Sequence, residues 1–145
     1  MIFIGVNGHF VSQHIKQCLI DFFVKKDNYN DQNLDDIHWI YNKLIENKHD
    51  LLKKAYLKSE CSLFTQKYEC GFSGCTAVTT IMIGNKILCA NAGDSRAIIV
   101  EFNEDWKVKE LSRDHKPELP DELERIQANN GRVERYTSSY TQHFL

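Results

Sequence analysis

The period of the apolar residues changes near Ser73, and this change constrains the fold more than any other feature of the sequence. Across residues 11–24, apolar side chains recur at intervals of three and four, which predicts an amphipathic helix with one buried face. A second stripe of this kind runs from Leu34 to Ala55 and predicts a helix that reaches about Lys58. We expect the two helices to form an antiparallel pair on a flat surface.

After Ser73 the apolar residues come in short runs that are rich in β-branched side chains, which is typical of strands. The predicted strands are Cys75–Ile83, Lys86–Asn91, Arg96–Phe102 and Trp106–Leu111. The turns between them are short, whereas parallel strands need crossovers of about a dozen residues or more, so we expect an antiparallel meander. Another short strand, Met1–Val6, is expected to end in a turn at Asn7-Gly8-His9.

The last part of the chain predicts one more helix. Pro120 suits the first helical position, acidic residues follow it, and Gly131 stands where a left-handed residue would end the helix. Residues 132–136 read as a short strand, and residues 136–145 as a loosely ordered tail. Helices combined with antiparallel strands predict an α+β fold, or a layered α/β sandwich, and we treat residues 1–145 as one domain.

The amino-acid composition limits which kinds of partner and which cellular compartment we expect for this chain. The 145 residues are 42% apolar and 26% charged with a net charge of −2, which fits a globular domain and argues against nucleic acid or membranes as partners. Neither a secretory signal nor an apolar run long enough to span a membrane is present, so we expect a cytoplasmic or nuclear protein. The five cysteines suggest buried, reduced thiols, and the closest pair, Cys70 and Cys75, is only a weak zinc signal.

Short polar clusters lie at the ends of the predicted strands, where a rigid scaffold often places functional groups. Each of them, taken alone, reads as an ordinary turn. The clusters are Asn7-Gly8-His9, Ser73-Gly74-Cys75-Thr76-Ala77, the segment 90–96 (A-N-A-G-D-S-R) and the segment 111–117 (L-S-R-D-H-K-P).

Taken in order, the motifs F-x-G-V-N-G-H, S-G-C-T-A, A-N-A-G-D-S-R, L-S-R-D-H-K-P and E-L-E-R-I-x-x-N-N-G-R-V resemble those of the type-2C metal-dependent protein serine/threonine phosphatases. That family carries D-G-H-G-G, S-G-[ST]-T-A, A-N-[AC]-G-D-S-R, L-[ST]-x-D-H-K-P and E-x-x-R-I-x-x-x-G-G-x-V with similar gaps. Five motifs in one order make the match specific. Residues 1–145 therefore resemble the central part of a PPM-type phosphatase domain.

The resemblance implies a layered α/β/β/α sandwich of antiparallel sheets flanked by helices, with a two-metal site at one end. In such a site, Mg²⁺ or Mn²⁺ ions held by aspartates activate a water that attacks a phosphoserine or phosphothreonine. A nearby histidine protonates the leaving alkoxide.

Carried over residue by residue, the resemblance places Asp94 at an aspartate that helps to bind an additional metal. It places His9 at the general acid and Gly8 at the glycine whose backbone oxygen contacts a metal. Asn7 stands where the family has its metal-bridging aspartate, and Phe10 and Val11 replace two glycines after the histidine.

The exchange at Asn7 argues against catalysis, because an asparagine is neutral and offers one carbonyl oxygen as a ligand. The resemblance also places the phosphate-gripping arginine and the later aspartates outside this chain. One carboxylate, that of Asp94, does not hold two hard cations, so we expect this chain alone to lack phosphatase activity.

Three interpretations follow. The first is a pseudophosphatase that serves as a structural or regulatory subunit, and the second is a fragment of an active Mg²⁺- or Mn²⁺-dependent phosphatase. Asparagine at position 7 favours the first, although Gly5-Val6 lies one residue nearer the histidine than the family's G-V. The third, a small α+β binding domain with chance motif matches, is disfavoured by the order of the motifs.

A partial sandwich also predicts a protein partner, because part of its inner surface would lack cover. We expect another protein or a second copy of the chain to complete it. The apolar residues that would need this cover are Ile81, Ile83, Ile98 and Val100.

Overall fold

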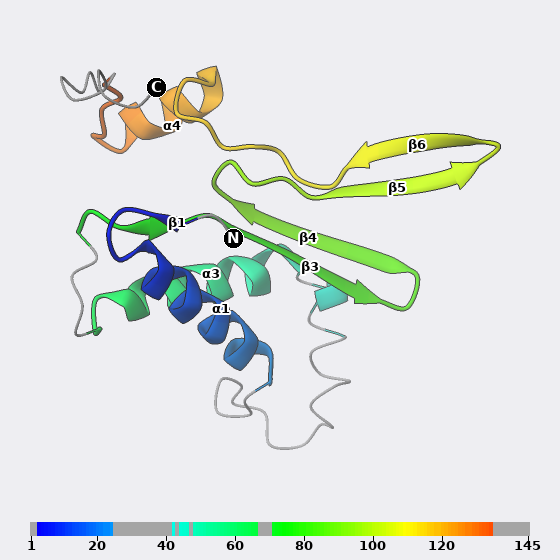
Figure 1. Cartoon of the computed structure of the whole chain (residues 1–145), viewed down its shortest axis with the longest axis horizontal. Coiled ribbons are helices and arrows are strands. Elements are labelled where there is room, and N and C mark those ends of the chain that lie inside the picture. The colour runs from blue at the N-terminus through cyan, green and yellow to red at the C-terminus, as the bar shows by residue number, and fades with distance from the viewer. Residues whose placement is uncertain (1–2, 25–41, 43, 47, 67–70, 135–145) are drawn as a thin grey trace, which may run out of the picture. The chain divides into compact units, whose positions relative to one another are not determined.

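A computed structural model describes residues 3–24, 42, 44–46, 48–66 and 71–134, and it divides the chain into two units, Met1–Asp114 and His115–Leu145. The described elements of the first unit are β1 (Phe3–Ile4), α1 (Gly8–Val24), α3 (Lys48–Leu63), β2 (Gly74–Cys75), β3 (Ala77–Ile83), β4 (Lys86–Ala92), β5 (Ile98–Asn103) and β6 (Asp105–Glu110) (Figure 1). The second unit contains α4 (Pro120–Ala128). The helices and antiparallel strands confirm the α+β class. Among the described helices, none is long and apolar enough to cross a membrane.

The helix pair α1 and α3 builds most of the core. The apolar stripe predicted on α1 is buried, with Val11 only 1% exposed, and it packs against Leu51, Leu52 and Ala55 of α3. Each helix differs from its prediction at one end. α1 begins at Gly8 rather than Val11, and α3 continues to Leu63 rather than ending near residue 58. The predicted start of the second helix, at residues 34–41, lies outside the described residues.

Local hydrogen bonds account for both differences. The carbonyl oxygen of Asn7 accepts the N–H of Val11 at 3.1 Å, so the first helical turn forms directly on the strand-end turn. Within α3, the Ser59 hydroxyl donates to the Ala55 carbonyl at 2.8 Å and the Ser62 hydroxyl donates to the Ser59 carbonyl at 2.6 Å. These bonds satisfy the serine hydroxyls inside the helix, and the helix therefore continues through them.

The strands pair antiparallel as β1 with β2, β3 with β4 and β5 with β6. The turn predicted at Gly84-Asn85 joins β3 to β4, with Ile83 opposite Lys86. The predicted four-stranded meander is wrong, because β4 and β5 do not pair in the described structure. The chain leaves β4 through Gly93, which has a φ of 99°, and the N–H of Ala97 donates to the Ser112 hydroxyl.

The β3–β4 hairpin packs on the helix pair, and Tyr56 of α3 joins the two layers. Its hydroxyl oxygen lies 2.9 Å from Oγ1 of Thr79 and 3.0 Å from the carbonyl oxygen of Ala90. Burial raises the pKa of the Tyr56 phenol. Ile81 and Ile83 are half-buried and pack against the helical core. In contrast, every residue of β5 and β6 is exposed.

The cysteines differ from the prediction of buried thiols. Cys18, Cys75 and Cys89 are half-buried free thiols, and Cys61 is exposed on α3. Cys61 is exposed because the buried stripe of this helix lies at residues 51, 52, 55 and 59, away from position 61. Cys70 lies outside the described residues, and the zinc prediction with it.

In the second unit, α4 begins at Pro120 as predicted, but the residue that ends it differs. Asn130, with a φ of 60°, takes the left-handed position that was predicted for Gly131. The N–H of Gly131 donates to the Ile126 carbonyl at 2.9 Å and the N–H of Asn130 to the Gln127 carbonyl at 3.0 Å, which is the Schellman pattern. Glycine is required at 131 for space, because a Cβ there would lie 2.7 Å from Cγ2 of Ile126.

The end of the chain was predicted to be a strand followed by a tail. Residues 132–134 are not a strand in the structure, which contradicts that part of the prediction. No strand register pairs them with another element in the described residues. The rest of the predicted strand and the tail, residues 135–145, lie outside the described residues.

Candidate functional site

The turn between β1 and α1 carries the first polar cluster, and glycine at position 5 makes the turn possible. Gly5 has a φ of 80°, and a Cβ on it would lie 2.1 Å from the carbonyl oxygen of Phe72. The N–H of Gly8 donates to the Gly5 carbonyl at 3.1 Å, and the N–H of Asn7 donates to Oγ of Ser73 at 3.1 Å. The turn therefore brings the first cluster against the start of the second.

Gly8 and His9, predicted in the turn, instead lie in the first turn of α1. Gly8 is buried, and as a helical residue it directs its carbonyl along the helix axis toward the residue four positions later. His9 is exposed, and the centroid of its ring lies 3.9 Å from that of Phe10. The hydroxyl of Ser12 donates to the His9 carbonyl at 2.9 Å.

The loop after β4 carries Asp94 and packs on the second cluster. A Cβ at Gly93 would lie 2.7 Å from Cγ2 of Thr76, so the backbone of the loop comes close to this side chain. Oγ1 of Thr76, which is buried, lies 2.7 Å from Oγ of Ser95. The Asp94 side chain is exposed. Ser73 and Thr76, three residues apart, thus contact the first and the third cluster respectively.

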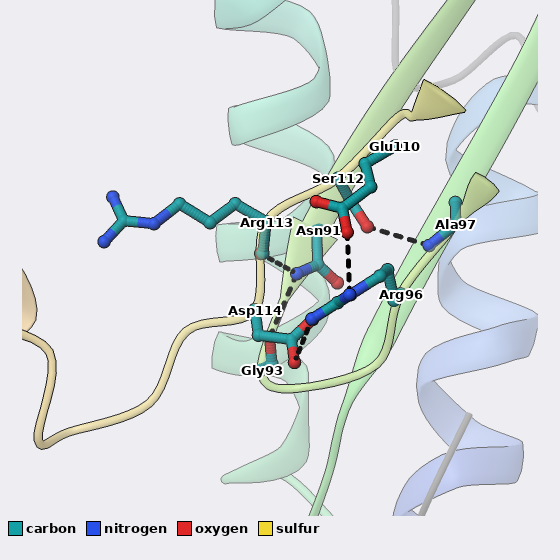
Figure 2. Close-up of polar contacts among 8 residues, drawn as sticks. All are labelled: Asn91, Gly93, Arg96, Ala97, Glu110, Ser112, Arg113 and Asp114. Atoms are coloured by element: carbon teal, nitrogen blue, oxygen red, sulfur yellow. Dashed lines mark hydrogen bonds and ion pairs between the residues drawn. The ribbon is translucent and has the colours of Figure 1, made fainter. Parts of the chain in front are cut away.

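Asn91 connects the third cluster to the fourth (Figure 2). Its Nδ2 donates to the carbonyl oxygens of Gly93 at 2.9 Å and Arg113 at 2.7 Å. Its Oδ1 is buried and accepts no hydrogen bond within the described structure. One amide group therefore ties together two loops whose carbonyls lie 20 positions apart in the sequence.

Arg96 makes a second connection between the same clusters (Figure 2). Its Nε and Nη2 donate to the two carboxylate oxygens of Asp114 at 2.9 and 3.1 Å, and its Nη1 donates to Oε1 of Glu110 at 2.7 Å. The hydrogen bond to Asp114 is the main reason that the pKa of Arg96 is raised. The sequence placed both residues in motifs, but it gave no sign that they pair.

The four clusters are therefore joined through side chains into one connected region. Sequence reasoning identified the clusters and missed that four of their own side chains connect them, those of Ser73, Thr76, Asn91 and Arg96. The signal that could have found these residues is their position, since all four belong to the S-G-C-T-A and A-N-A-G-D-S-R motifs.

The donor atoms do not fit a two-metal site. Within residues 3–24, 42, 44–46, 48–66 and 71–134, no three His, Cys, Asp or Glu side chains lie close enough to hold one metal ion. The predicted set of Asn7, Gly8, His9 and Asp94 contains a single carboxylate, and Gly8 directs its carbonyl along α1. Hard dications need several anionic oxygens, and this set supplies only one carboxylate.

Comparison with known proteins gives a match along almost the whole chain. A family model described as "Protein phosphatase 2C" matches residues 1–143. "Probable protein phosphatase 2C 72" of Arabidopsis thaliana is 32% identical over 136 residues, which are 89% of this chain and 38% of that protein. "Probable protein phosphatase 2C 2" of Paramecium tetraurelia is 28% identical over 144 residues, which are 91% of this chain and 42% of that protein.

Another relative matches a shorter stretch of the chain at higher sequence identity. "Probable protein phosphatase 2C 61" of Arabidopsis thaliana is 47% identical over 68 residues, which are 46% of this chain and 21% of that protein. The chain thus spans less than half the length of each of these relatives.

Proposed function

Because this chain belongs to the protein phosphatase 2C family, we propose that it is a pseudophosphatase, a phosphatase-like protein that does not catalyse and acts as a structural or regulatory subunit. One observation carries the proposal, namely the asparagine at position 7, where the resemblance assigns the metal-bridging aspartate. The family is generally dependent on Mg²⁺ or Mn²⁺, and this chain offers only Asp94 as a matching carboxylate.

The electrostatics of the exchange support this proposal. Two dications held a few ångströms apart repel each other strongly unless anionic oxygens lie between them. A bridging carboxylate supplies that charge, and each lost contact between a unit charge and a dication removes on the order of several kcal/mol. Asn7 is neutral, and its backbone N–H and C=O groups already bond Ser73 and Val11. These bonds hold the backbone of the turn in place.

The test is a phosphatase assay of the purified chain with Mn²⁺, using p-nitrophenyl phosphate and a phosphothreonine peptide. We expect no turnover above that of buffer. The matched variants are Asp94→Ala, at the predicted ligand, and Asp105→Ala, at the exposed aspartate that begins β6. Metal-dependent turnover that Asp94→Ala abolishes and Asp105→Ala preserves would overturn the proposal.

The second candidate is a fragment of an active Mg²⁺- or Mn²⁺-dependent phosphoserine/phosphothreonine phosphatase. It is favoured by the length, because the chain spans 38% and 42% of the relatives that it matches over most of its own residues. Calorimetric titration with Mn²⁺ separates the two candidates. A pseudophosphatase gives no heat at millimolar Mn²⁺, whereas metal binding that is weakened by Asp94→Ala favours the fragment.

We also place the protein in the cytoplasm or nucleus. The described cysteines are free thiols, which suits a reducing compartment. Expression of the chain with a fluorescent tag tests this placement, and secretion of the tagged chain, seen as fluorescence outside the cell, would contradict it.

A further inference from the structure

The β5–β6 hairpin carries one face that is apolar and exposed. Paired residues of an antiparallel ladder share a face, and the register places Val100 opposite Val108 and Phe102 opposite Trp106. We name the following set the hairpin's apolar face: Ile98 (53% exposed), Val100 (48%), Phe102 (63%), Trp106 (73%) and Val108 (63%). Exposed large apolar side chains clustered in this way mark an interaction surface.

The other face of the same hairpin is polar apart from Ile99. It presents Glu101, Asn103, Asp105, Lys107 and Lys109. The alternation is that of a strand pair with one face in water and one face buried. The alternation thus indicates that the apolar face is meant to be buried, since side chains selected only for water would not alternate.

We propose that the hairpin's apolar face is the contact surface of a homodimer of this chain. The inference goes beyond the proposed function, because the five residues of the hairpin's apolar face lie outside the motif clusters and the contact holds whether or not the chain binds metal. Two hairpins would stack face to face in opposite directions about a two-fold axis.

The shape of the face favours a second copy. Its aromatic residues, Phe102 and Trp106, lie at the turn end with ring centroids 4.9 Å apart. Its smaller aliphatic residues lie toward the other end. Antiparallel stacking sets the aromatic end of one copy over the aliphatic end of the other, which alternates large and small side chains across the interface.

The charge on this face also permits burial. Glu110, opposite Ile98, is the charged residue on this side of the hairpin, and Arg96 binds it at 2.7 Å. Burial of an unpaired charge is the usual obstacle to an apolar contact, and it does not arise here.

The area sets the expected affinity. Aromatic side chains bury about 150–250 Å² each, so at the observed exposures the face offers on the order of 400–500 Å² with its aliphatic residues included. Two copies with their rims bury about 1,000 Å², which is at the small end of specific interfaces. A dimer of this size dissociates in roughly the micromolar range.

The test is analytical ultracentrifugation of the chain over a range of concentrations. We expect a dimer at about 50 μM that dissociates on dilution. Val108→Glu should weaken dimerisation at least about tenfold, because it places like charges near the two-fold axis. Lys107→Glu introduces the same side chain at the neighbouring residue on the polar face and should leave the dimer unchanged.

A cross-linking pair covers the case in which Val108→Glu does not fold. Val108→Cys is a small change, and under mild oxidation it should give a disulfide-linked dimer, whereas Lys107→Cys should not exceed the background from the native cysteines. A wild-type chain that is monomeric at about 100 μM would overturn the inference and leave the face to a different protein. Equal cross-linking of the two cysteine variants would overturn it as well.

Discussion

Replacing Gly5 with alanine tests whether the turn that presents Asn7-Gly8-His9 depends on a missing side chain. Gly5 has a φ of 80°, which costs an alanine roughly 1–2 kcal/mol. In addition, the new Cβ would lie 2.1 Å from the carbonyl oxygen of Phe72, far inside the 3.0 Å below which real Cβ contacts are essentially never found. Because that oxygen belongs to the backbone, the segment itself must move.

The magnitude follows from these two costs. Forced overpacking costs about 1–3 kcal/mol, and a shift at this point also disturbs the hydrogen bond from Asn7 to Ser73, worth about 1 kcal/mol. Alanine recovers about 0.4–1 kcal/mol by restricting the unfolded chain. We therefore expect Gly5→Ala to lower the free energy of unfolding by about 2–6 kcal/mol.

Two other glycines provide matched controls for urea denaturation followed by circular dichroism. Gly84 has a φ of 58° with nothing within 4 Å of a Cβ, so Gly84→Ala carries the backbone cost alone, about 1 kcal/mol. Gly74 has open space and no positive φ, so Gly74→Ala should change stability by less than about 0.5 kcal/mol. If Gly5→Ala were no more destabilising than Gly84→Ala, the steric argument would be refuted.

Three further predictions concern titratable groups. Burial raises the pKa of Tyr56, so the unfolded chain ionises first as the pH rises, and the free energy of unfolding should be full below the ordinary tyrosine pKa and fall above it. Tyr56→Phe should cost about 1 kcal/mol and abolish that alkaline loss, as measured by urea denaturation at a series of pH values. The hydrogen bond from Arg125 lowers the pKa of Glu122, so the stabilisation of α4 by this pair should be present above the ordinary glutamate pKa and lost as the pH falls through the lowered value. If Glu122→Gln lost helicity in acid to the same extent as the wild-type chain, as measured by circular dichroism, this prediction would be contradicted. Burial raises the pKa of the Cys75 thiol, so iodoacetamide at pH 8 should modify it more slowly than the exposed Cys61, and mass spectrometry of the peptides measures both rates.

Features set by near neighbours could be predicted from the sequence. The spacing of apolar residues located the buried stripe of α1, and Gly84-Asn85 located the β3–β4 turn. These predictions succeeded because helix faces and two-residue turns depend on interactions within a few positions. The family was also predictable, because the order of the motifs is a property of the sequence itself.

Features that depend on contacts between distant residues could not be predicted. The short turns suggested a single meander. In the structure, however, the N–H of Ala97 donates to Ser112, just after β6, and Asn91 at the end of β4 donates to the carbonyl of Arg113, so β4 and β5 do not pair. The deciding partners, Ser112 and Arg113, lie outside the window in which a local pattern operates. The error at position 131 is a local one, because Asn130 takes the positive φ and the contact with Ile126, five positions earlier, leaves no room for a Cβ on Gly131.

The candidate site shows the same division. The sequence alone determined which residues stand at the motif positions, including the asparagine at 7 that removes a charge, because residue identity fixes charge and ligand chemistry. Only the tertiary structure decided that Ser73, Thr76 and Arg96 join the motif loops to one another, since these contacts span 18 to 66 positions of the chain and their geometry arises from packing.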